Sequence, residues 1–337
     1  MPYTKELTAL KNAFHESGIV WTWNESMAPH TTFRIGGVAT LVAWPTGQQQ
    51  LVTVLSLWRS LGNKCPICIL GKGSNVLFPD RGFHGLVVMT TKAKRVVFAE
   101  DMAEDKEAFR GNNSFTCQVF AECGAPLIGL AYQCGTDERG LSGLEFACGI
   151  PGTVGGATVM NAGAYGSDMQ SILLATEYYD LSNGYTVSLR AEDMELEYRH
   201  SIYLDHPEWI VLNSVIQLHY GYAPDIRAKM EYNKKSRQEK QPIDLPSAGS
   251  VFKRPVDNFA GRMVEEVGLK GAYVGDAQVS EKHAGFIVNK GNATARDVME
   301  LVRLVQDAVE KKYRYRLECE IRLIDDGLDP NGPLKWD

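Results

Sequence analysis

The chain has 337 residues, of which 44% are hydrophobic and 23% are charged, and its formal net charge is −6. This composition is typical of a folded protein, and the length predicts two or three domains. The sequence has no basic stripe that would neutralise nucleic-acid phosphates, so we expect no nucleic-acid partner. Apolar runs are far shorter than the roughly 20 residues that cross a bilayer, and residues 1–11 lack the apolar core of a signal peptide. We therefore expect a cytoplasmic protein with no membrane role.

The seven cysteines are scattered along the chain. Cys65 and Cys68 have the C-x-x-C spacing of some metal and redox sites, but no second pair and no histidine partner accompanies them. We expect buried, reduced thiols and no metal site.

The first unit is expected over residues 1–90. Thr46 is placed to cap a helix with one apolar face, and Gly62 follows the end of that face. Short apolar stretches predict strands at 66–70 and 86–89. The apolar face of the helix consists of Leu51, Val54, Leu55, Trp58 and Leu61.

The second unit is expected over residues 91–224. Its polar, acidic stretch at 100–113 predicts an exposed loop without a function of its own. Alternation over 116–122 predicts a strand, and 126–134 has the pattern of a helix.

The third unit is expected over residues 225–325, followed by a polar tail at 326–337. It begins with a charged, helix-favouring stretch that two prolines end. Thr294 and Asp297 resemble a capping box for an amphipathic helix. Residues 315–324, YRLECEIRLI, then alternate between apolar and charged side chains, which predicts a strand. One face of that strand would carry Tyr315, Leu317, Cys319, Ile321 and Leu323, and the other would carry Arg316, Glu318, Glu320 and Arg322.

Two glycine-rich loops, at residues 71–75 and 150–166, stand out in the sequence. Glycine lets a backbone approach a ligand closely, and successive backbone N–H groups form a concave site for anionic oxygens such as those of a diphosphate. Neither loop matches the G-x-G-x-x-G fingerprint or the P-loop, so a Rossmann interpretation is weak. Tight turns alone would explain the first loop equally well. Two such loops together suggest one long ligand.

Six motifs in order resemble the UDP-N-acetylenolpyruvoylglucosamine reductase family, and nearly the whole chain takes part in the resemblance. The spacing between the fourth and fifth motifs is similar to that of the shorter of the family's two classes. The motifs are TTFRIGG (31–37), GKGSN (71–75), GIPGTVGGATVMNAGAYG (149–166), YRHS (198–201), PSAGSVFKRP (246–255) and GLKGAYVGDAQVSEKHAGFIVNKGNATARDV (268–298).

The resemblance implies an α+β fold, with two subdomains that bind FAD as in flavoproteins of the vanillyl-alcohol-oxidase type and a third, C-terminal α+β domain that binds the substrate. It implies NADPH-dependent reduction of UDP-N-acetylglucosamine enolpyruvate to UDP-N-acetylmuramate, a step of peptidoglycan precursor synthesis. FAD would be held non-covalently, NADPH would be the reductant, and the protein would act as a monomer on this small molecule. A flavin oxidase of an alcohol or sugar, and a non-catalytic flavoprotein, remain as alternatives.

The resemblance also assigns site residues. Arg199 would bind the substrate carboxylate as its charge grows, Ser250 would donate a proton, and Glu320 would orient the substrate or relay a proton. Alternation alone does not separate Glu320 from Glu318, and we interpret His283 as structural. The cofactor residues would be Gly71, Lys72, Gly73, Ser74, Asn75, Pro151, Gly152, Thr153, Gly155, Gly156, Asn161 and Gly163, and the substrate residues would be Tyr165, Lys240, Lys253 and Arg254.

Overall fold

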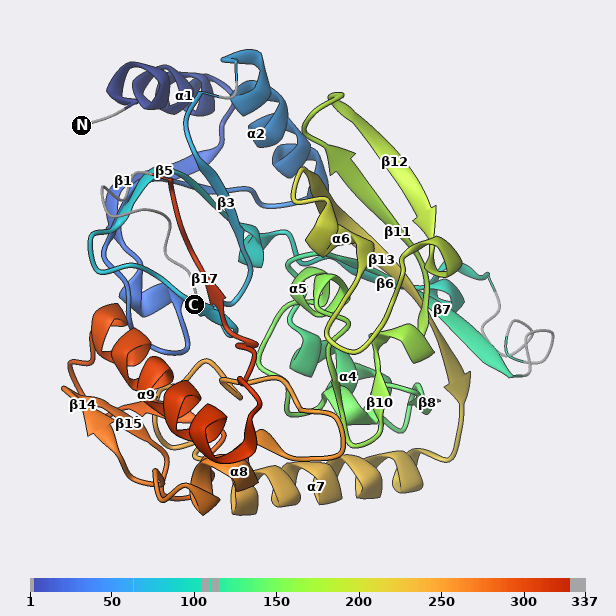
Figure 1. The fold of residues 1–337 in the computed structure, drawn as a ribbon. Helices are drawn as coiled ribbons and strands as arrows, with labels where there is room; N and C mark the ends of the chain where they lie inside the picture. The colour runs from blue at the N-terminus through green and yellow to red at the C-terminus, as the bar shows by residue number, and fades with distance from the viewer. Residues whose placement is uncertain (1–2, 63, 105–109, 111–114, 328–337) are drawn as a thin grey trace.

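Three regions, each built on its own β-sheet, make up the molecule (Figure 1). The computed structural model describes residues 3–62, 64–104, 110 and 115–327. An N-terminal region in blue and cyan and a second region in green and yellow lie side by side, and the orange and red C-terminal region lies against both. The predicted α+β class is therefore confirmed. None of the helices in the described ranges has the length and apolar character to span a membrane.

The N-terminal region contains a four-stranded sheet in the order β1-β2-β5-β3. β1 runs antiparallel to β2, whereas β2 and β3 both run parallel to β5. The parallel strands are short and apolar, as expected for strands buried on both faces. The elements are α1 (Thr4–Glu16), β1 (Val20–Ser26), η1 (Ala28–His30), β2 (Val38–Trp44), α2 (Gln48–Ser60), β3 (Ile67–Leu70), β4 (Val76–Leu77), β5 (Phe83–Met89) and η2 (Thr90–Lys92).

Helix α2 has the predicted apolar face, and Leu51, Val54, Leu55 and Trp58 are buried. Gly62 follows the helix at a φ of +82°, a conformation that glycine adopts readily. The prediction that Thr46 caps this helix is wrong. The residue at the N-cap is Gly47, without a side-chain cap, and the Thr46 hydroxyl instead lies 3.0 Å from Oε1 of Gln50.

The second region is a six-stranded antiparallel sheet, in which β12-β11-β13-β7-β6 form a continuous path and β8 pairs with the end of β13. The predicted strand at 116–122 is β7 and the predicted helix at 126–134 is α4. The elements are β6 (Val96–Phe98), η3 (Ala99–Met102), β7 (Thr116–Glu122), α4 (Leu127–Cys134), β8 (Leu141–Ser142), η4 (Glu145–Ala147), α5 (Val154–Val159), β9 (Gly163–Ala164), β10 (Ser167–Asp168), η5 (Met169–Ser171), β11 (Leu173–Asp180), β12 (Tyr185–Arg190), η6 (Ala191–Asp193), α6 (Ile202–Asp205), β13 (Trp209–Tyr220) and α7 (Ala223–Lys240).

The acidic stretch at 100–113 differs from the prediction at its first residue, and its residues 105–109 and 111–113 lie outside the described residues. Glu100 is buried, because its carboxylate accepts hydrogen bonds from Arg110 at 2.9 Å and from Arg139 at 2.8 Å. The hydroxyl of Tyr220 donates a third, at 3.0 Å. Two guanidinium groups thus neutralise a carboxylate that the charge pattern alone places in solvent.

The C-terminal region combines a three-stranded antiparallel sheet, β14-β15-β16, with two helices. The capping box is confirmed, since the Thr294 hydroxyl accepts a hydrogen bond from the Asp297 N–H and the Asp297 carboxylate accepts one from the Thr294 N–H. The predicted amphipathic helix is α9, and its apolar side is buried, with Val298, Leu301, Val302, Val305 and Val309. The elements are α8 (Ala260–Glu266), β14 (Tyr273–Val274), β15 (Ala277–Val279), β16 (Ile287–Asn289), α9 (Ala295–Tyr313) and β17 (Arg322–Leu323).

The predicted strand over 315–324 is largely wrong. Only β17 is a strand, and it pairs in parallel with β4 of the N-terminal region, while Cys319 makes one isolated bridge with Phe252. Leu317 and Ile321 are buried as the alternation predicts, but Tyr315 is exposed. The segment runs extended between two regions and has a strand partner only at its end, so the alternation reports burial rather than pairing.

Hydrophobic packing joins the first two regions. One core cluster contains residues of α1, β2, α2, β7 and β13, and Ile226 and Met230 of α7 also belong to it. A separate cluster fills the C-terminal region and takes in Phe33, Ile35 and Leu77 from the N-terminal region. The domain boundaries at 90/91, 224/225 and 325/326 stay predictions.

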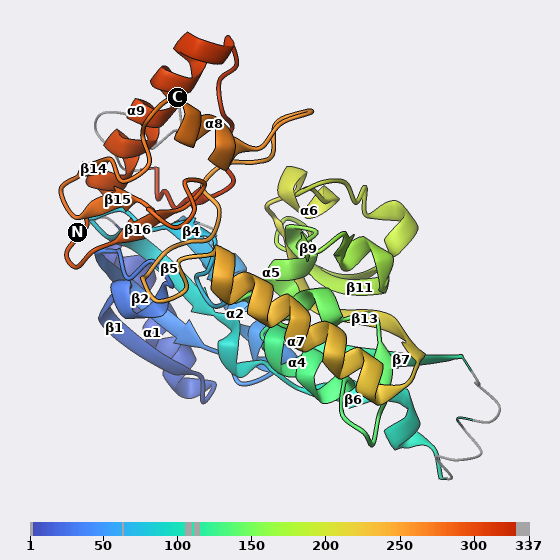
Figure 2. The same cartoon turned by 90° about the horizontal axis from the view of Figure 1, so that it is seen from below.

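The first helix of the predicted third unit and the first residue of the predicted tail both contact other regions. Helix α7 packs under the second region and leads from it to the C-terminal region (Figure 2). At the end of the chain, Asp326 is buried and its carboxylate accepts hydrogen bonds from Arg81 at 2.5 Å and from the backbone N–H of His84 at 2.8 Å. Asp326 is thus fixed to the N-terminal region, and residues 328–337 of the predicted tail lie outside the described residues.

Candidate active site

The two glycine-rich loops lie side by side. A Cβ placed on Gly71 would be 2.5 Å from the hydroxyl oxygen of Thr153, and one placed on Gly152 would be 3.5 Å from Oγ of Ser74. The contact at Gly71 is too close for any side chain, so glycine is what lets the loop after β3 approach the loop before α5. Loops about 80 positions apart in the sequence therefore form one surface, as the idea of a single long ligand requires.

The first loop offers backbone donors. In the described part of the chain, the N–H groups of residues 72–75 make no hydrogen bond to a protein acceptor, while the carbonyl of Gly73 accepts one from the Thr32 N–H at 3.0 Å. Gly73 has a φ of +60°. A loop with free N–H groups at a left-handed glycine is the kind of backbone concavity that binds anionic oxygens.

A cavity of about 280 Å³ adjoins both loops and is lined by Gly71, Lys72, Pro151, Trp44 and His30 among others. The ring centroids of His30 and Trp44 are 5.2 Å apart in an edge-to-face arrangement. Free N–H donors, a lysine and an aromatic wall in one place fit a cofactor that combines a diphosphate with flat rings, as FAD does.

Gly155 and Gly156 have different surroundings. Gly155 is buried, its N–H donates to the Cys123 carbonyl at 2.8 Å, and a Cβ on it would be 2.6 Å from Cβ of Cys123. Gly156 is exposed, and a Cβ on it would meet only Oγ1 of Thr153 at 3.5 Å. Gly155 therefore allows α5 to pack against the end of β7, whereas Gly156 faces open space.

Asn161 and Gly163 support the neighbouring turn. Asn161 is buried and both ends of its side-chain amide are used: Nδ2 donates to the Glu197 carbonyl at 2.8 Å and Oδ1 accepts from the Gln170 N–H at 2.9 Å. The carbonyl of Gly163 accepts a hydrogen bond from Nη2 of Arg199 at 3.1 Å. Their contacts with the cofactor stay predictions.

Arg199 lies at the tip of a tight turn between Glu197 and His200, with a φ of +57°. Its Nε donates to Oε1 of Glu320 at 2.7 Å. A residue other than glycine held in this left-handed conformation indicates that the surrounding structure fixes the turn, as is common at functional sites. The Arg199–Glu320 pair joins the second region to the C-terminal region.

The structure distinguishes Glu320 from Glu318, which the alternation of the sequence does not. Only 13% of the Glu320 side chain is exposed, compared with 67% for Glu318, which pairs with Lys253 at 3.3 Å. Burial raises the pKa of Glu320, and the charge and hydrogen bond of Arg199 oppose that shift. Glu320 thus has the environment of a functional carboxylate and Glu318 that of a surface ion pair.

Ser250 comes directly after Gly249, which has a φ of +83°, and forms an isolated bridge with Phe286. The carbonyl of the next residue, Val251, accepts a hydrogen bond from the Glu320 N–H at 2.7 Å. Ser250 and Glu320 are therefore on adjacent, bonded segments, and Arg199 reaches the same point through Glu320.

The predicted substrate residues come from several different elements. The Tyr165 hydroxyl donates to the Asn233 carbonyl at 2.8 Å, and Lys240 is exposed at the last residue of α7. The Arg254 N–H donates to the hydroxyl of Tyr198 at 3.2 Å. The Lys253 side chain is engaged by Glu318, so that lysine is less free for a ligand than the sequence implies.

Arg237 is a residue that the sequence analysis missed. It lies on α7 beside Tyr165 and over Gly149, and burial lowers its pKa. Within the described ranges it has no carboxylate partner. A desolvated guanidinium without an anion is costly, which favours an anionic ligand at this position. Its charged surroundings in the sequence, KKSRQEK, gave no signal that separated it from solvated neighbours.

His283 agrees with the structural interpretation. Its Nδ1 accepts a hydrogen bond from the Gly285 N–H at 3.0 Å, its ring packs edge-on against Phe286, and burial lowers its pKa. All seven cysteines are free, and five of them are buried. Burial raises the pKa of Cys123 and that of Cys134 to about 12, so these thiols stay protonated near neutral pH.

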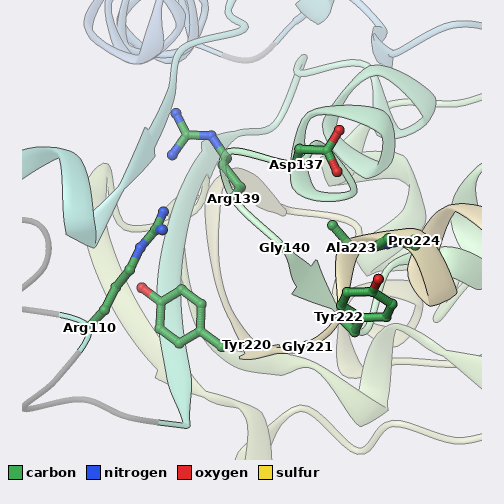
Figure 3. Close-up of a pocket in the computed structure, with 9 residues that line it drawn as sticks. All are labelled: Arg110, Asp137, Arg139, Gly140, Tyr220, Gly221, Tyr222, Ala223 and Pro224. Carbon is green, nitrogen blue, oxygen red and sulfur yellow. The ribbon is translucent and has the colours of Figure 1, made fainter.

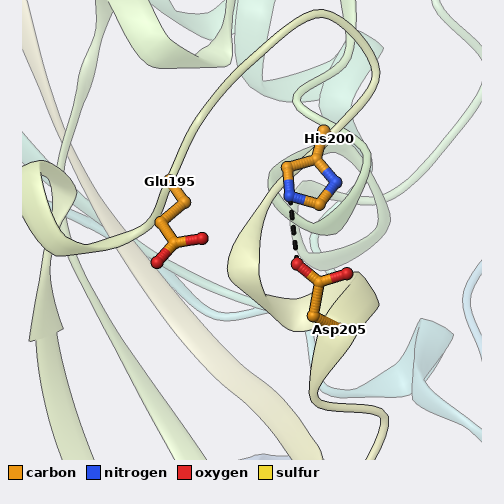
Figure 4. A group of neighbouring side chains, drawn as sticks. All are labelled: Glu195, His200 and Asp205. Atoms are coloured by element: carbon orange, nitrogen blue, oxygen red, sulfur yellow. Dashed lines mark ion pairs between the residues drawn. The ribbon is translucent and has the colours of Figure 1, made fainter.

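Two other features lie apart from the loops. The side chains of Glu195, His200 and Asp205 lie close together (Figure 4), and an ion pair of 3.1 Å between His200 and Asp205 ties the turn that ends at His200 to α6. A cavity of about 610 Å³ between the end of β13 and the start of α7 contains none of the predicted site residues (Figure 3). Arg110 and Arg139 line it, and both pair with Glu100.

Comparison with known proteins decides the family. A model of the C-terminal domain of UDP-N-acetylenolpyruvoylglucosamine reductase matches residues 241–324, and an FAD binding domain model matches residues 39–190. The reductase of Caldanaerobacter subterraneus subsp. tengcongensis is 42% identical over 301 residues, covering 89% of this chain and 92% of that protein. The chain belongs to the UDP-N-acetylenolpyruvoylglucosamine reductase family.

Other members of this reductase family agree. The reductase of Syntrophomonas wolfei is 41% identical over 302 residues, covering 89% of this chain and 94% of that protein. The crystal structure of the reductase from Thermus caldophilus superposes with a TM-score of 0.69 at 30% identity, covering 90% of this chain and 98% of that one. The likeness therefore spans both the FAD-binding regions and the C-terminal region, and the resemblance noted from the motifs is confirmed.

Proposed function

We propose that this chain reduces UDP-N-acetylglucosamine enolpyruvate to UDP-N-acetylmuramate, with NADPH as the reductant and non-covalently bound FAD, in peptidoglycan precursor synthesis. The observation that carries the proposal is the meeting of Arg199, Glu320 and the Ser250 segment, next to a loop whose backbone N–H groups are free. FAD, when bound, would accept hydride from NADPH and deliver it to the substrate. The remaining steps are the work of this chain's own side chains.

Arg199 would stabilise charge on the substrate. Addition of hydride to the terminal carbon of the enolpyruvyl group moves negative charge into the conjugated carboxylate. Nε and Nη2 of Arg199 are held by Glu320 and Gly163, which leaves Nη1 as a positioned donor for that carboxylate. A guanidinium fixed in advance needs no reorganisation when the charge develops.

Ser250 would supply the proton that completes the reduction. A serine hydroxyl is a weak acid, so it needs nearby positive charge when it donates. Arg199 provides such charge. Glu320, whose pKa is raised by burial, can hold a proton at higher pH than an exposed glutamate and would relay it or orient the substrate.

The substrate residues are also proposals. Tyr165 and Lys240 would bind the diphosphate of the substrate, Lys253 and Arg254 would contact it from the C-terminal region, and we add Arg237. Support comes from the position of Arg237 beside Tyr165 and its lack of an anionic partner in the described residues. The protein would act as a monomer in the cytoplasm, without a nucleic-acid or membrane partner, and light scattering of the purified protein tests the oligomeric state.

The test separates the two half-reactions by rapid mixing without oxygen. The purified protein should be yellow, lose its colour with NADPH and regain it with UDP-N-acetylglucosamine enolpyruvate. In Ser250→Ala, colour loss should stay within about twofold of the unchanged protein, while recovery should slow by roughly 10²–10⁴-fold, the usual contribution of general acid catalysis. Ser250→Cys should retain more activity than Ser250→Ala, because a thiol can still donate a proton.

Ser60→Ala, an exposed position on α2, provides a matched control that should change neither rate. If Ser250→Ala slows both half-reactions equally, Ser250 supports the site and is not the acid. Colour recovery only with oxygen, accompanied by peroxide, would instead identify a flavin oxidase.

A further inference from the structure

Asn75, the last residue of the first glycine-rich loop, contacts the segment that carries Glu320. Its side-chain Nδ2 donates a hydrogen bond to the backbone carbonyl of Glu320 at 3.1 Å. Its own carbonyl accepts one from the Arg322 N–H at 3.0 Å. The parallel pairing of β4 with β17 begins at the very next residue. The proposed phosphate-binding loop and the Glu320 segment are therefore bonded directly to each other.

These contacts fix the backbone of Glu320 on both sides. Its N–H donates to the Val251 carbonyl at 2.7 Å and its carbonyl accepts from Asn75, so neither peptide group next to its Cα is free to rotate. Its carboxylate then meets Nε of Arg199 at 2.7 Å. The direction of the carboxylate thus depends on a short stretch of backbone held from two different regions.

Further contacts hold this segment on the N-terminal side of Glu320: the Glu318 carbonyl accepts a hydrogen bond from the Lys253 N–H at 2.9 Å, and the Leu317 carbonyl accepts one from Nε2 of Gln306 at 2.9 Å. Between the end of α9 and β17 it forms one isolated bridge, at Cys319, among the described residues. This bridge ties Glu320 to the Val251 segment of the same region, whereas strand pairing with the N-terminal region begins only at Arg322. The amide of Asn75 is the side-chain contact through which the N-terminal region reaches the Glu320 peptide.

We propose that Asn75 is a positioning residue for Glu320, and that it couples the cofactor-binding loop to the substrate-reducing site. This inference rests on the proposed function. Without the amide donor, the Glu320 peptide can turn and its carboxylate can move relative to Arg199. Misplacement by about 1 Å is enough to cost on the order of 100-fold in rate. Colour loss with NADPH does not require Glu320, so the effect should be confined to recovery of colour with the substrate.

Asn75→Ala tests this inference, with Asn12→Ala on the exposed side of α1 as the matched control. The cofactor contact proposed for this loop is made by backbone N–H groups, which Asn75→Ala keeps, so we expect FAD content and colour loss with NADPH within about threefold of the unchanged protein, and colour recovery slowed by roughly 10–100-fold. Asn12→Ala should alter none of these. If Asn75→Ala does not fold, Asn75→Ser carries the same test, because its hydroxyl is too short to reach the Glu320 carbonyl.

A double-mutant cycle shows whether Asn75 acts through Glu320. In a Glu320→Gln background, where the carboxylate is already absent, adding Asn75→Ala should slow colour recovery by less than about twofold, because residues that act through each other are not additive. Amide hydrogen exchange gives a readout without activity: a peptide covering 317–323 should exchange faster in Asn75→Ala, and a peptide from α9 should not.

The outcomes separate this inference from the proposed function. If the unchanged protein is not recoloured by the enolpyruvyl substrate, the proposed function fails. If it is recoloured and Glu320→Gln slows recovery while Asn75→Ala does not, the positioning role alone is wrong. Loss of FAD from Asn75→Ala, with both half-reactions slowed, would show that Asn75 acts on the cofactor and would also overturn the inference.

Discussion

Gly155→Ala should destabilise the fold, whereas Gly156→Ala should not. The new Cβ at position 155 would lie 2.6 Å from Cβ of Cys123 and 3.0 Å from its carbonyl oxygen. Favourable carbon contacts lie at about 3.5–4.0 Å, so the methyl group would be roughly 1 Å too close. The pairing of β7 with β13 limits how far this backbone can shift.

Overpacking of this kind costs about 1–3 kcal/mol, and replacing a helical glycine regains about 0.5–1 kcal/mol. The net loss should be about 1–2 kcal/mol in the free energy of unfolding. At position 156 the new Cβ would lie 3.5 Å from Oγ1 of Thr153, an ordinary contact, so only the helix gain remains. The exposed methyl group would, however, stand where we propose that the cofactor lies.

Urea unfolding of the two FAD-free variants, followed by circular dichroism, measures the first effect, and FAD bound after reconstitution measures the second. Gly155→Ala should unfold at lower urea than the unchanged protein and Gly156→Ala should not, while Gly156→Ala should bind FAD more weakly. If Gly155→Ala unfolds at the same urea concentration as Gly156→Ala, the packing argument is wrong. Full FAD occupancy in Gly156→Ala would reject the cofactor placement.

Three further results are expected. Acid precipitation should release the yellow colour into the supernatant, because residues 71–75 and 150–166 contain no cysteine or histidine that could bind flavin covalently; colour in the pellet would contradict this. Arg199→Lys should slow colour recovery by about 10–100-fold in rapid mixing. The single nitrogen of an ammonium group cannot take the separate positions from which Nε and Nη2 bond Glu320 and Gly163, and a charged hydrogen bond contributes about 1.5–3 kcal/mol. Glu100→Gln should lower the free energy of unfolding by about 1–3 kcal/mol at neutral pH in urea titrations, because it removes the buried charge that pairs with Arg110 and Arg139, while Arg139 keeps its ion pair with Asp101 and Arg110 is partly exposed. Burial alone would raise the pKa of Glu100, but its hydrogen bonds to Arg110, Tyr220 and Arg139 lower it. The stability that Glu100 contributes is therefore fully present above the unfolded-state pKa, about 4, and is lost as the pH falls through the pKa of the folded state. A difference between Glu100→Gln and the unchanged protein that grows in acid would refute this.

Local sequence patterns correctly predicted the elements that are defined by contacts between neighbouring residues. The apolar face of α2, the strand β7 and the capping box of α9 follow from side chains within a few residues of one another. The order of the motifs identified the family and made Arg199, Ser250 and Glu320 the candidate catalytic residues. These features need no knowledge of what lies across the fold.

Contacts between distant segments decided the rest. Thr46 was a good cap by type, but the backbone placed Gly47 at that position. Glu100 is buried because Arg139, remote in sequence, reaches it, and residues 315–321 are not a strand because they pair with another segment only at the single bridge between Cys319 and Phe252. Glu318 and Glu320 have equivalent places in the alternation, but Glu318 is exposed beside Lys253 whereas Glu320 is largely buried beside Arg199. Periodicity reports which side of a segment is buried, whereas the charge, the pairing and the role of each side chain depend on the partner that the folded chain brings to it.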